Sequence, residues 1–589
     1  MVKQAEDALQ TTAAPHCQPE KSIIPKIWPI SVLLCALAYV LCILATTVPL
    51  YSAAVLLPME TGISKAIISV GHYLHISPDP HTTQNSYTSQ QTTSLIEFLL
   101  LMLCMFIVYI LCAICIQRQK AYIFRARNYI ILLIIGITTM LAAYIYVFTP
   151  ATLSEDIYLY ADYGRILLTH HANPYFTPPL SFPQDPLFHF VWWKNIVAIY
   201  GPIWMLVCAA LTSFTGTNAA HIFLAFRIFA STIHIINTIL IFAILRTKGC
   251  SICTVLLGTQ LYAWNPLVLF ESSSGGHNDL LMVTFALAGI LYAVRTEKSG
   301  ELRIAYYIPS LLAFTLAVLV KFTIIPILAL FIIMLSFKTY SSSATLTITV
   351  WRRLRLALLT GFLASTICLS IACLFYGPFW LGHNIKDILH IFSSQPPANF
   401  AFTSLLSALQ VWNNIHPLPA VLAHLLSLRI WNILIYGGMI LVLLLSGICL
   451  LHAPTIRNMV LMTLAVMTAF LLTTNWFLPW YVTWTVSLAV VCLPTAEYHI
   501  GRAKRVEQAL FALTLTFSFS AFLTYYYNFI GSFYMRTRPT HIGWLMLAYF
   551  ATFTLPVLAF LVFLVRRPLQ NLQNVLAEAY SICFSRVVE

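Results

Sequence analysis

Long apolar runs separated by short polar segments dominate the chain. Runs long enough to cross a hydrocarbon core of about 30 Å begin near residues 28, 95, 129, 220, 251, 354, 430, 507 and 543. Shorter apolar runs lie at 279–294, 304–320, 323–337, 457–473 and 477–494. The pattern predicts an all-α polytopic membrane protein with about 13–14 transmembrane helices.

The composition agrees with a chain whose main partner is the lipid bilayer. Of the 589 residues, 60% are hydrophobic and 9% are charged, whereas a soluble domain has about 25% charged residues. The net charge of +13 does not indicate nucleic acid as a partner, because the basic residues form short clusters between apolar runs, as they do when they fix membrane orientation. The cysteines fall mostly inside apolar runs, where they act as small hydrophobic residues.

The distribution of Lys and Arg indicates the orientation of the chain. With a cytoplasmic N-terminus, these residues favour the cytoplasmic side only if the short run 201–215 does not cross the membrane. We therefore expect 201–215 to form a re-entrant or interfacial helix. The run 304–337 is too long for one span, and Pro326 predicts a break near Lys321. No cleavable signal peptide is visible, so the first apolar run is expected to be a membrane anchor.

With this topology the chain is expected to have six parts. They are a cytoplasmic tail (1–27), N-terminal spans (28–149), an extracytoplasmic loop (150–219), a transmembrane core (220–494), C-terminal spans (495–565) and a cytoplasmic tail (566–589). The loop at 150–200, the turn at 271–279, the break at Lys321 and the loop at 377–429 then share the extracytoplasmic face.

The first of these loops concentrates acidic, basic and aromatic residues in an otherwise apolar chain. It contains "SEDIYLYADYGRILLTHHANPYFTPP" at 154–179. Its spacing predicts a helix over 155–168 that places Asp156 and Tyr160 on one face. Ionisable groups at membrane depth are costly and tend to be functional, so this loop is the leading candidate for chemistry.

Two local interactions offer a simpler explanation for part of the cluster. Asp162 and Arg165 can pair across one helical turn. Ser154 fits the N-cap position, and an acid in the first turn, Glu155 or Asp156, can simply stabilise the start of the helix.

A second constellation is "WNPLVLFESSSGGHNDLLMV" at 264–283. An apolar span ends at Glu271, and His277, Asn278 and Asp279 follow a Ser/Gly turn at the start of the next span. The free N–H groups of a helix N-terminus attract anions such as phosphate. The alternative is that Asn278 or Asp279 simply caps the helix.

Two further features have open roles. Lys321 is a lone charge between apolar segments, which can either reach the interface or hold a lipid phosphate. The aromatic cluster "NWFLPWYVTW" at 475–484 is typical of an interfacial belt, although aromatic faces also stack on sugars.

The motif "EDIYLYADYGRILLTHHANPYF" resembles the first large loop of GT-C type membrane glycosyltransferases. It is similar in particular to the bacterial branch that uses polyprenyl-phosphate mannose, a family 87-like group with loops of the form D-[IV]-Y-x-Y-x-x-x-G-R-x-x-x-x-x-x-N-P-Y. Matching residues are Asp156, Tyr158, Tyr160, Gly164, Arg165, Asn173, Pro174 and Tyr175. The motifs that follow this loop in the bacterial branch also resemble later segments of this chain, in the same order. The resemblance covers about residues 130–490. The loop follows the third expected span here, whereas it usually follows the first in the family.

The resemblance implies a GT-C fold whose extracytoplasmic loop bears short interfacial helices. It also implies a multi-pass plasma-membrane enzyme that transfers a hexosyl residue, mannosyl by analogy. The donor would be a polyprenyl-phosphate sugar and the acceptor a glycan or glycolipid. Catalysis would be inverting, with Asp156 as general base, Asp162 in support and no cofactor. The donor phosphate and substrate would be bound by Arg165, Tyr160, Asn173, Tyr175, His277, Asn278, Asp279 and Lys321. No metal is expected, because His170, His171 and His277 lack the ligand spacing typical of zinc.

Two other classes of protein fit the spans. A secondary transporter or a lipid or glycolipid flippase also has many spans and few acids, but transporters usually contain repeated halves. The 154–179 pattern has no second copy in the chain. A scaffold that keeps the fold without catalysis is the other alternative.

Overall fold

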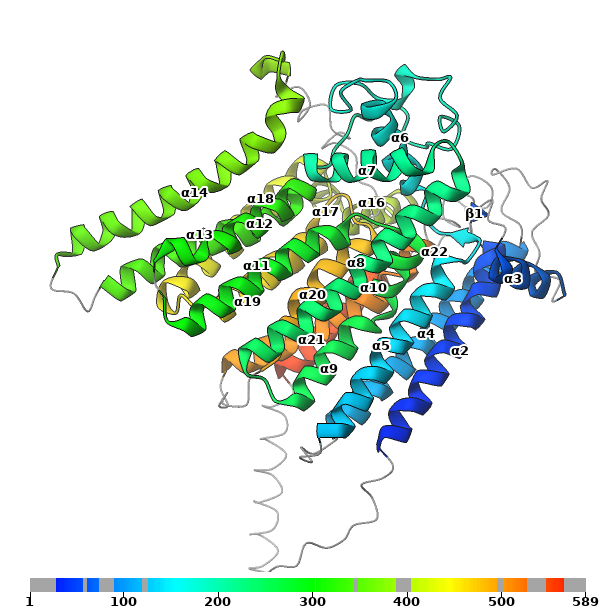
Figure 1. Cartoon of the computed structure of the whole chain (residues 1–589), viewed down its shortest axis with the longest axis horizontal. Helices are drawn as coiled ribbons and strands as arrows, with labels where there is room; N and C mark the ends of the chain where they lie inside the picture. Colours follow the sequence, from blue (N-terminus) through cyan, green and yellow to red (C-terminus); the bar gives the residue numbers. More distant parts are fainter. Residues whose placement is uncertain are drawn as a thin grey trace, which may run out of the picture.

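The computed structural model describes residues 28–53, 55–56, 61–73, 89–118, 125–301, 303–343, 348–387, 404–494, 502–526 and 547–565. The two expected cytoplasmic tails, 1–27 and 566–589, lie outside these residues, as does part of the loop at 377–429. The described chain forms a bundle of long helices, with several short helices and the largest group of loops at one end (Figure 1).

Eleven helices of the described residues are long and apolar enough to cross a membrane, which confirms the all-α polytopic architecture. Ten of them correspond to the elements α2 (Trp28–Ala53), α4 (Ser89–Arg118), α5 (Arg125–Val147), α8 (Ala219–Lys248), α11 (Asp279–Ser299), α13 (Ile325–Ser342), α14 (Val350–Trp380), α18 (Leu428–His452), α19 (Ile456–Thr473) and α21 (Arg502–Ser520). The last runs over Leu547–Val565. Three of the eleven precede Asp156, as the span count from the sequence predicts.

The expected number of spans is higher because it includes runs that form shorter elements. The run at 251 is a bent pair, α9 (Ile252–Ala263) and the segment Pro266–Gly275, with 49° between them. The other two shorter elements are α12 (Ile308–Val320), with 13 residues, and α20 (Val482–Val491), with 10. A helix of 10 residues is about 15 Å long, half the thickness of a hydrocarbon core. Since every residue of α20 is buried, this helix packs inside the bundle.

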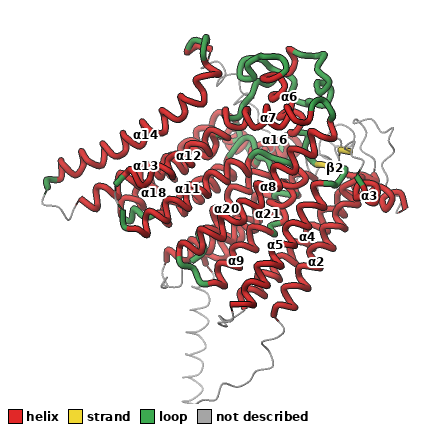
Figure 2. Tube along the Cα trace, viewed as in Figure 1, coloured by secondary structure: helices red, strands yellow, loops and turns green. Residues whose placement is uncertain are grey.

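Loops and short elements lie at the upper end of the bundle in Figure 1, and Figure 2 shows the loops in green there. This end carries α3 (Gly62–Tyr73), α6 (Asp156–Leu168) and α7 (Pro202–Thr215). The short helices α10 (Pro266–Phe270), α16 (Leu405–Ile415), α17 (Ala420–Leu425) and α22 (Leu523–Tyr526) complete the described α-helices. One small ladder departs from the all-α expectation: β1 (Val55–Leu56) pairs antiparallel with β2 (Ala151–Thr152). Two residues per strand are too few to leave a periodic pattern in the sequence.

Helix α6 packs closely on α7, the helix expected not to cross the membrane. Figure 1 shows α7 beside α6 at the end of the bundle, at an angle to the long helices. A Cβ atom added at Gly164 of α6 would lie 2.5 Å from the Cys208 carbonyl oxygen of α7. Glycine at this position therefore allows the two backbones to approach, and the contact holds α6 in place at the bundle end.

The predicted break at Lys321 is confirmed. Lys321 has extended backbone angles (φ −153°, ψ 118°) between α12 and α13, and Pro326 lies in the first turn of α13. The Gly201 N–H donates to the Val320 carbonyl oxygen at 3.0 Å. The break is thereby joined to the start of α7, which brings Lys321 to the same end of the bundle as α6.

Arg227, inside α8, connects three segments around this end. Its buried guanidinium donates to the carbonyl oxygens of Thr149 at 2.7 Å, Ala151 at 2.9 Å and Ser274 at 2.8 Å. These carbonyls belong to the residues that follow α5, to strand β2 and to the π-helical segment Glu271–Gly275 after α10. Hydrogen bonds to a charged group are among the stronger ones in proteins, so Arg227 fixes the turn at 271–279 relative to the segment that leads into α6.

Candidate active site

Asp156 is the first residue of α6, whose observed bounds agree closely with the predicted helix over 155–168. The Ser154 hydroxyl accepts the Asp156 N–H at 3.3 Å, while Glu155 occupies the N-cap position without a side-chain capping bond. The Asp156 side chain is 19% exposed, although most of α6 is buried. The Tyr160 hydroxyl lies 3.5 Å from Asp156 Oδ2. The helix start thus presents a carboxylate that a ligand can reach.

His277 lies between two carboxylates. Its Nδ1 is 3.5 Å from Asp156 Oδ2 and its Nε2 is 3.3 Å from Glu271 Oε2. The ring is fully buried and stacks on Trp480, with centroids 3.8 Å apart and planes at 14°. Burial disfavours the imidazolium, but the contacts with Asp156 and Glu271 outweigh it and raise the pKa of His277 to about 9. At neutral pH His277 is therefore a buried cation beside Asp156.

Two glycines allow the turn to carry His277 to this position. Gly276 has φ +66°, in the left-handed region that favours glycine. A Cβ atom there would lie 2.7 Å from Ile157 Cδ1, and one at Gly275 would lie 2.6 Å from the His277 ring. The Gly-Gly pair is consequently a steric requirement for bringing the turn against the start of α6.

Glu271 extends the row of polar groups into the bundle. It begins a π-helical segment, Glu271–Gly275, and its side chain is fully buried. The Tyr525 hydroxyl donates to Glu271 Oε1 at 2.7 Å. Asp156, His277, Glu271 and Tyr525 therefore form a continuous row from the accessible carboxylate to the core. We name it the carboxylate–histidine row.

A second polar cluster surrounds Lys321. Its ammonium donates to Asp279 Oδ1 at 2.8 Å, and the Trp484 indole N–H donates to the same oxygen at 2.6 Å. The Lys321 Nζ atom also lies 4.3 Å from the centroid of the Tyr481 ring and 5.9 Å from that of Tyr200. Burial, followed by Asp279 and then Asp156, raises the pKa of Tyr481 well above its usual range. Tyr481 therefore lies close enough to both the Lys321 cluster and Asp156 to feel the charge of each.

Several buried polar atoms of the turn at 271–279 make no hydrogen bond within the described residues. They are both ring nitrogens of His277, both side-chain amide atoms of Asn278, Glu271 Oε2 and Asp279 Oδ2. The His277 nitrogens are close enough to the carboxylates for ion pairing, but not in hydrogen-bond geometry. Buried polar groups are normally paired, so this turn has capacity left for water or a ligand.

The sequence suggests Asp162 as the partner of Arg165, but in the structure Arg165 pairs with Asp185. Its Nε lies 3.0 Å from Asp185 Oδ2, and its Nη2 lies 2.9 Å from the same oxygen. His170 Nε2 is 2.8 Å from this oxygen and its ring stacks on Phe182. The i, i+3 spacing within the helix favoured Asp162, but the loop folds back and brings Asp185 to Arg165 instead. The Arg165–Asp185 pair thus joins helix α6 to the loop that follows it.

Asn173 and Tyr175 also make contacts within the protein. The Asn173 amide donates to the Phe379 carbonyl oxygen, and its side-chain oxygen accepts the Tyr175 N–H at 3.0 Å. The Tyr175 hydroxyl donates to the Tyr200 carbonyl oxygen at 2.8 Å. The structure places both residues where they hold the loop against α14 and the segment leading into α7.

Asp162 lies near the Arg165–Asp185 pair rather than in the carboxylate–histidine row. It is buried, and its Oδ2 has no hydrogen-bond partner within the described part of the chain. Burial, then the charge of Asp185, raises the pKa of Asp162 to about 7, while Arg165 acts in the opposite direction.

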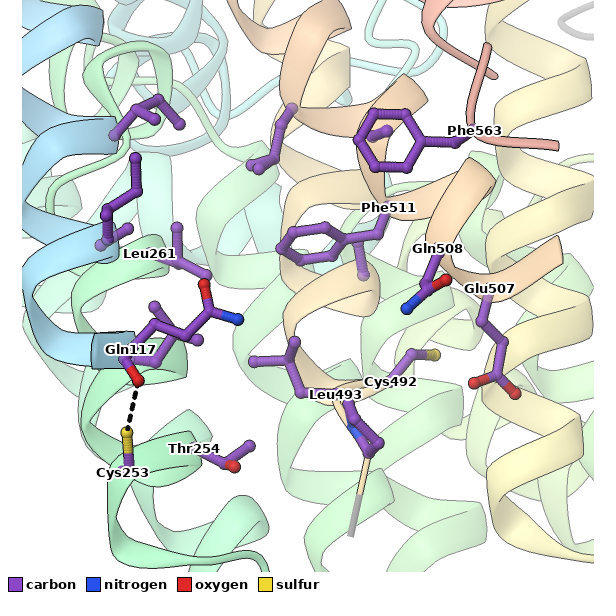
Figure 3. A pocket seen from close by; sticks show the side chains of 18 of the residues that line it. Gln117, Cys253, Thr254, Leu261, Cys492, Leu493, Glu507, Gln508, Phe511 and Phe563 are labelled. Carbon is purple, nitrogen blue, oxygen red and sulfur yellow. Dashed lines mark hydrogen bonds between the residues drawn. The ribbon is translucent and has the colours of Figure 1, made fainter. Parts of the chain in front are cut away.

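A cavity of about 270 Å³ opens beside Asp156. We call it the tryptophan cavity because four tryptophans line it together with Glu155 and Asp156: Trp192, Trp193, Trp476 and Trp480. A larger cavity of about 850 Å³ lies at the other end of the bundle, between α4, α9, α20 and α21 (Figure 3). Its lining, which includes Cys253 and Glu507, contains no residue of the carboxylate–histidine row. Chemistry at Asp156 therefore belongs to the smaller cavity.

The residues described here include no group of three His, Cys, Asp or Glu side chains that could hold a metal ion. His170 and His277 contact different carboxylates, Asp185 and Asp156.

His171 has φ 49°, a conformation uncommon for a non-glycine residue.

Neither Tyr525 nor Asp185 was predicted as a site residue, and the motif that contains Glu271 and His277 did not indicate that their side chains pair. Tyr525 carries no local signal, since it follows a long apolar run far from the other site residues. Arg227 did carry a signal, because a charged residue inside a span indicates a structural or functional partner.

Comparison with known proteins relates the chain to one family. Residues 61–338 match the family described as "Alpha-(1->6)-mannopyranosyltransferase, N-terminal domain". An alpha-(1->6)-mannopyranosyltransferase of Mycobacterium tuberculosis is 28% identical over 161 residues. This match covers 25% of the present chain and 25% of that protein, so the chain spans about a quarter of the length of this curated relative. No solved structure matches the chain.

The matched segment includes Asp156, His277 and Lys321. Residues 61–338 are thus similar to the N-terminal domain of the alpha-(1->6)-mannopyranosyltransferase family, which confirms the resemblance to membrane mannosyltransferases that the loop motif indicates.

Proposed function

We propose that this protein is a membrane glycosyltransferase that transfers a mannosyl residue from a polyprenyl-phosphate donor to a glycan or glycolipid acceptor on the extracytoplasmic side. The observation that carries the proposal is the position of Asp156. It is a partly exposed carboxylate at a cavity wall, held against a buried histidine, within a segment similar to a mannosyltransferase family domain.

Asp156 acts as general base in this proposal. The acceptor hydroxyl gives its proton to the Asp156 carboxylate while its oxygen forms a bond to C1 of the donor sugar. The bond between C1 and the phosphate oxygen breaks, and polyprenyl phosphate leaves as an anion. Attack from the face opposite the leaving group inverts the configuration at C1. The phosphate carries one negative charge in the donor and gains a second as the C1–O bond breaks, so it needs positive or N–H partners more than a proton donor.

The carboxylate–histidine row supports this role. The His277 ring lies 3.5 Å from Asp156 Oδ2, so its positive charge can hold the carboxylate in place beside the cavity. Glu271 and Tyr525 hold the other edge of the ring, and the stack on Trp480 fixes its plane. Because His277 is fully buried, it acts through Asp156 as a positioning residue.

The donor phosphate is assigned to the Lys321 cluster. Lys321 supplies a cation and Trp484 supplies an N–H donor. In the structure both donate to Asp279 Oδ1. Asn278 adds an amide with free hydrogen-bonding capacity at the start of α11. A phosphate that binds here shares these donors with Asp279. Arg165, Asn173 and Tyr175 then act indirectly, through the fold of the loop.

Transfer of radiolabel tests the proposal. The purified protein, reconstituted in lipid, is given polyprenyl-phosphate [¹⁴C]mannose and an α-mannosyl acceptor. We expect a labelled product lengthened by one mannose, with the anomeric configuration inverted relative to the donor. Failure to transfer any sugar from a panel of polyprenyl-phosphate donors would contradict the proposal and would favour the transporter or flippase alternative.

A further inference from the structure

The tryptophan cavity has the size and position of a site for one sugar ring. Its volume of about 270 Å³ lies just below the roughly 300–1,000 Å³ of pockets that bind drug-sized molecules. One hexose ring therefore fits it better than an oligosaccharide or a polyprenyl chain. The cavity is open to the outside of the protein, since Trp192 in its wall is 71% exposed.

The aromatic rings come from two segments that are distant in the sequence. Trp192 and Trp193 lie in the loop between α6 and α7, and Trp476 and Trp480 lie between α19 and α20. The Trp193 and Trp476 rings approach to 5.7 Å between centroids at an angle of 50°. The face of an aromatic ring is electron-rich, and it suits the C–H groups on the flat face of a sugar. Trp192 both lines the cavity and is 71% exposed, so one face of its ring is available to a ligand that enters the cavity.

Two neighbouring carboxylates complete the wall. Glu155 and Asp156 both line the cavity, and burial, then the charge of Asp156, raises the pKa of Glu155. Carboxylate oxygens accept hydrogen bonds from sugar hydroxyls. A pocket with aromatic faces and a few convergent polar groups is typical of small-molecule recognition.

The position of the base decides which sugar the cavity receives. A general base must lie within hydrogen-bond reach of the proton that it removes. In the proposed reaction this proton belongs to the acceptor, whereas the reacting carbon of the donor loses none. We propose that the tryptophan cavity is the acceptor subsite, where the terminal hexose of the glycan or glycolipid stacks on Trp192 and Trp476 with its attacking hydroxyl at Asp156 and a second hydroxyl at Glu155. This inference rests on the proposed function and adds the location of the acceptor to it.

The kinetic test varies one substrate at a time. Octyl α-D-mannopyranoside serves as acceptor, and the variants are Trp192→Ala, Trp192→Phe and Trp476→Ala. A platform that binds the ground state and the transition state equally changes KM and leaves kcat alone. We expect the two alanine variants to raise the acceptor KM about 10-fold, as loss of a stacking surface does, with the donor KM within about twofold of wild type. Trp192→Phe keeps a ring and should recover most of the loss.

Trp351→Ala is the matched control, because Trp351 lies on α14 with 79% exposure and outside this cavity. It should leave both KM values unchanged. A rise in donor KM with an unchanged acceptor KM would overturn the inference and assign the cavity to the donor sugar. Unchanged values for both substrates in both alanine variants would also overturn it.

A binding measurement separates this inference from the proposed function. Octyl α-D-mannopyranoside is titrated into the Asp156→Asn variant without donor, and binding is followed by calorimetry against octyl glycerol, which has the same chain but no sugar ring. We expect saturable, sugar-dependent binding that Trp476→Ala weakens. If wild type transfers no sugar but this binding is found, the transferase proposal fails and the hexose subsite stands. Absence of sugar-dependent binding would overturn the subsite even if transfer occurs.

Discussion

The imidazole of His277 lies 3.5 Å from the carboxylate of Asp156, and on its other side 3.3 Å from that of Glu271. This relationship joins a helix start in the 150–200 loop to a turn between two transmembrane segments. Because His277 contacts Asp156, a change of pH that removes the charge of His277 should change the activity.

Activity should fall as the pH rises through about 9. The folded-state pKa of His277 is raised from 6.5 to about 9, so its favourable charge is fully present below 6.5 and is lost as the pH passes 9. Above that pH, Asp156 no longer has a cation beside it. A profile of kcat/KM between pH 6 and 10 should show this alkaline limb in the wild type.

His277→Gln should abolish the alkaline limb and lower kcat at pH 7. Glutamine keeps polar atoms in the turn but cannot carry the charge. Retention of the same limb in the variant would show that another group produces it.

The conformation of the turn can be tested with two glycines that differ in their surroundings. Gly276 and Gly300 both have left-handed backbone angles, but only at Gly276 would a Cβ atom meet a neighbour, Ile157 Cδ1 at 2.7 Å. We expect Gly276→Ala to lower transfer at least about 10-fold, because a misplacement of about 1 Å in a site has large effects on rate. Gly300→Ala carries the same backbone strain, about 1 kcal/mol, without the clash, and its transfer rate should match the wild type. Equal losses in both variants would show that backbone strain alone is responsible.

Arg165 should matter for stability more than for substrate binding. Its guanidinium pairs with the buried Asp185, and removal of one partner of a buried ion pair costs about 3–5 kcal/mol. We therefore expect Arg165→Met to lower the Tm strongly, while the folded fraction keeps the wild-type donor KM. Adding Asp185→Leu should recover part of the Tm, because it removes the unpaired carboxylate. A large rise in donor KM at unchanged Tm would instead assign Arg165 to the donor phosphate, as the resemblance implies.

Asp162 gives a pH dependence of stability with a defined sign. Its pKa is raised from 3.8 to about 7, so the folded protein binds more protons than the unfolded chain between these values. The free energy of unfolding therefore falls as the pH rises from about 4 to 7, by a few kcal/mol at most. Asp162→Asn should lack this loss and be more stable than wild type above pH 7, with the difference vanishing near pH 4. Thermal unfolding at several pH values measures it, and a variant that is less stable at every pH would contradict the assignment.

The sequence predicted those features that depend on short segments. The helix over 155–168, the break at Lys321 and the helical bundle all follow from apolar runs, spacing and proline positions. The motifs at 154–179 and 264–283 also predicted Asp156 and the turn at 271–279 as candidate site residues. Each of these inferences needs residues that lie within about two helical turns of each other.

The contacts that build the site join segments far apart in the chain, and no local pattern predicts them. The Trp484 indole and Lys321 meet on one oxygen of Asp279, and Tyr525 reaches Glu271 from the C-terminal part of the bundle. Local spacing was misleading for Arg165, because an acid three residues away competes with Asp185, which only the folded loop brings near.

In the proposed reaction, Asp156 removes the proton of the acceptor hydroxyl. The most direct measurement is the initial rate of mannosyl transfer from polyprenyl-phosphate mannose by Asp156→Asn and wild-type protein at equal amounts of folded enzyme. The amide has nearly the same shape but accepts no proton, so we predict a loss of about 10²–10⁴-fold in kcat with both KM values close to wild type. Transfer by Asp156→Asn at the wild-type rate would contradict it.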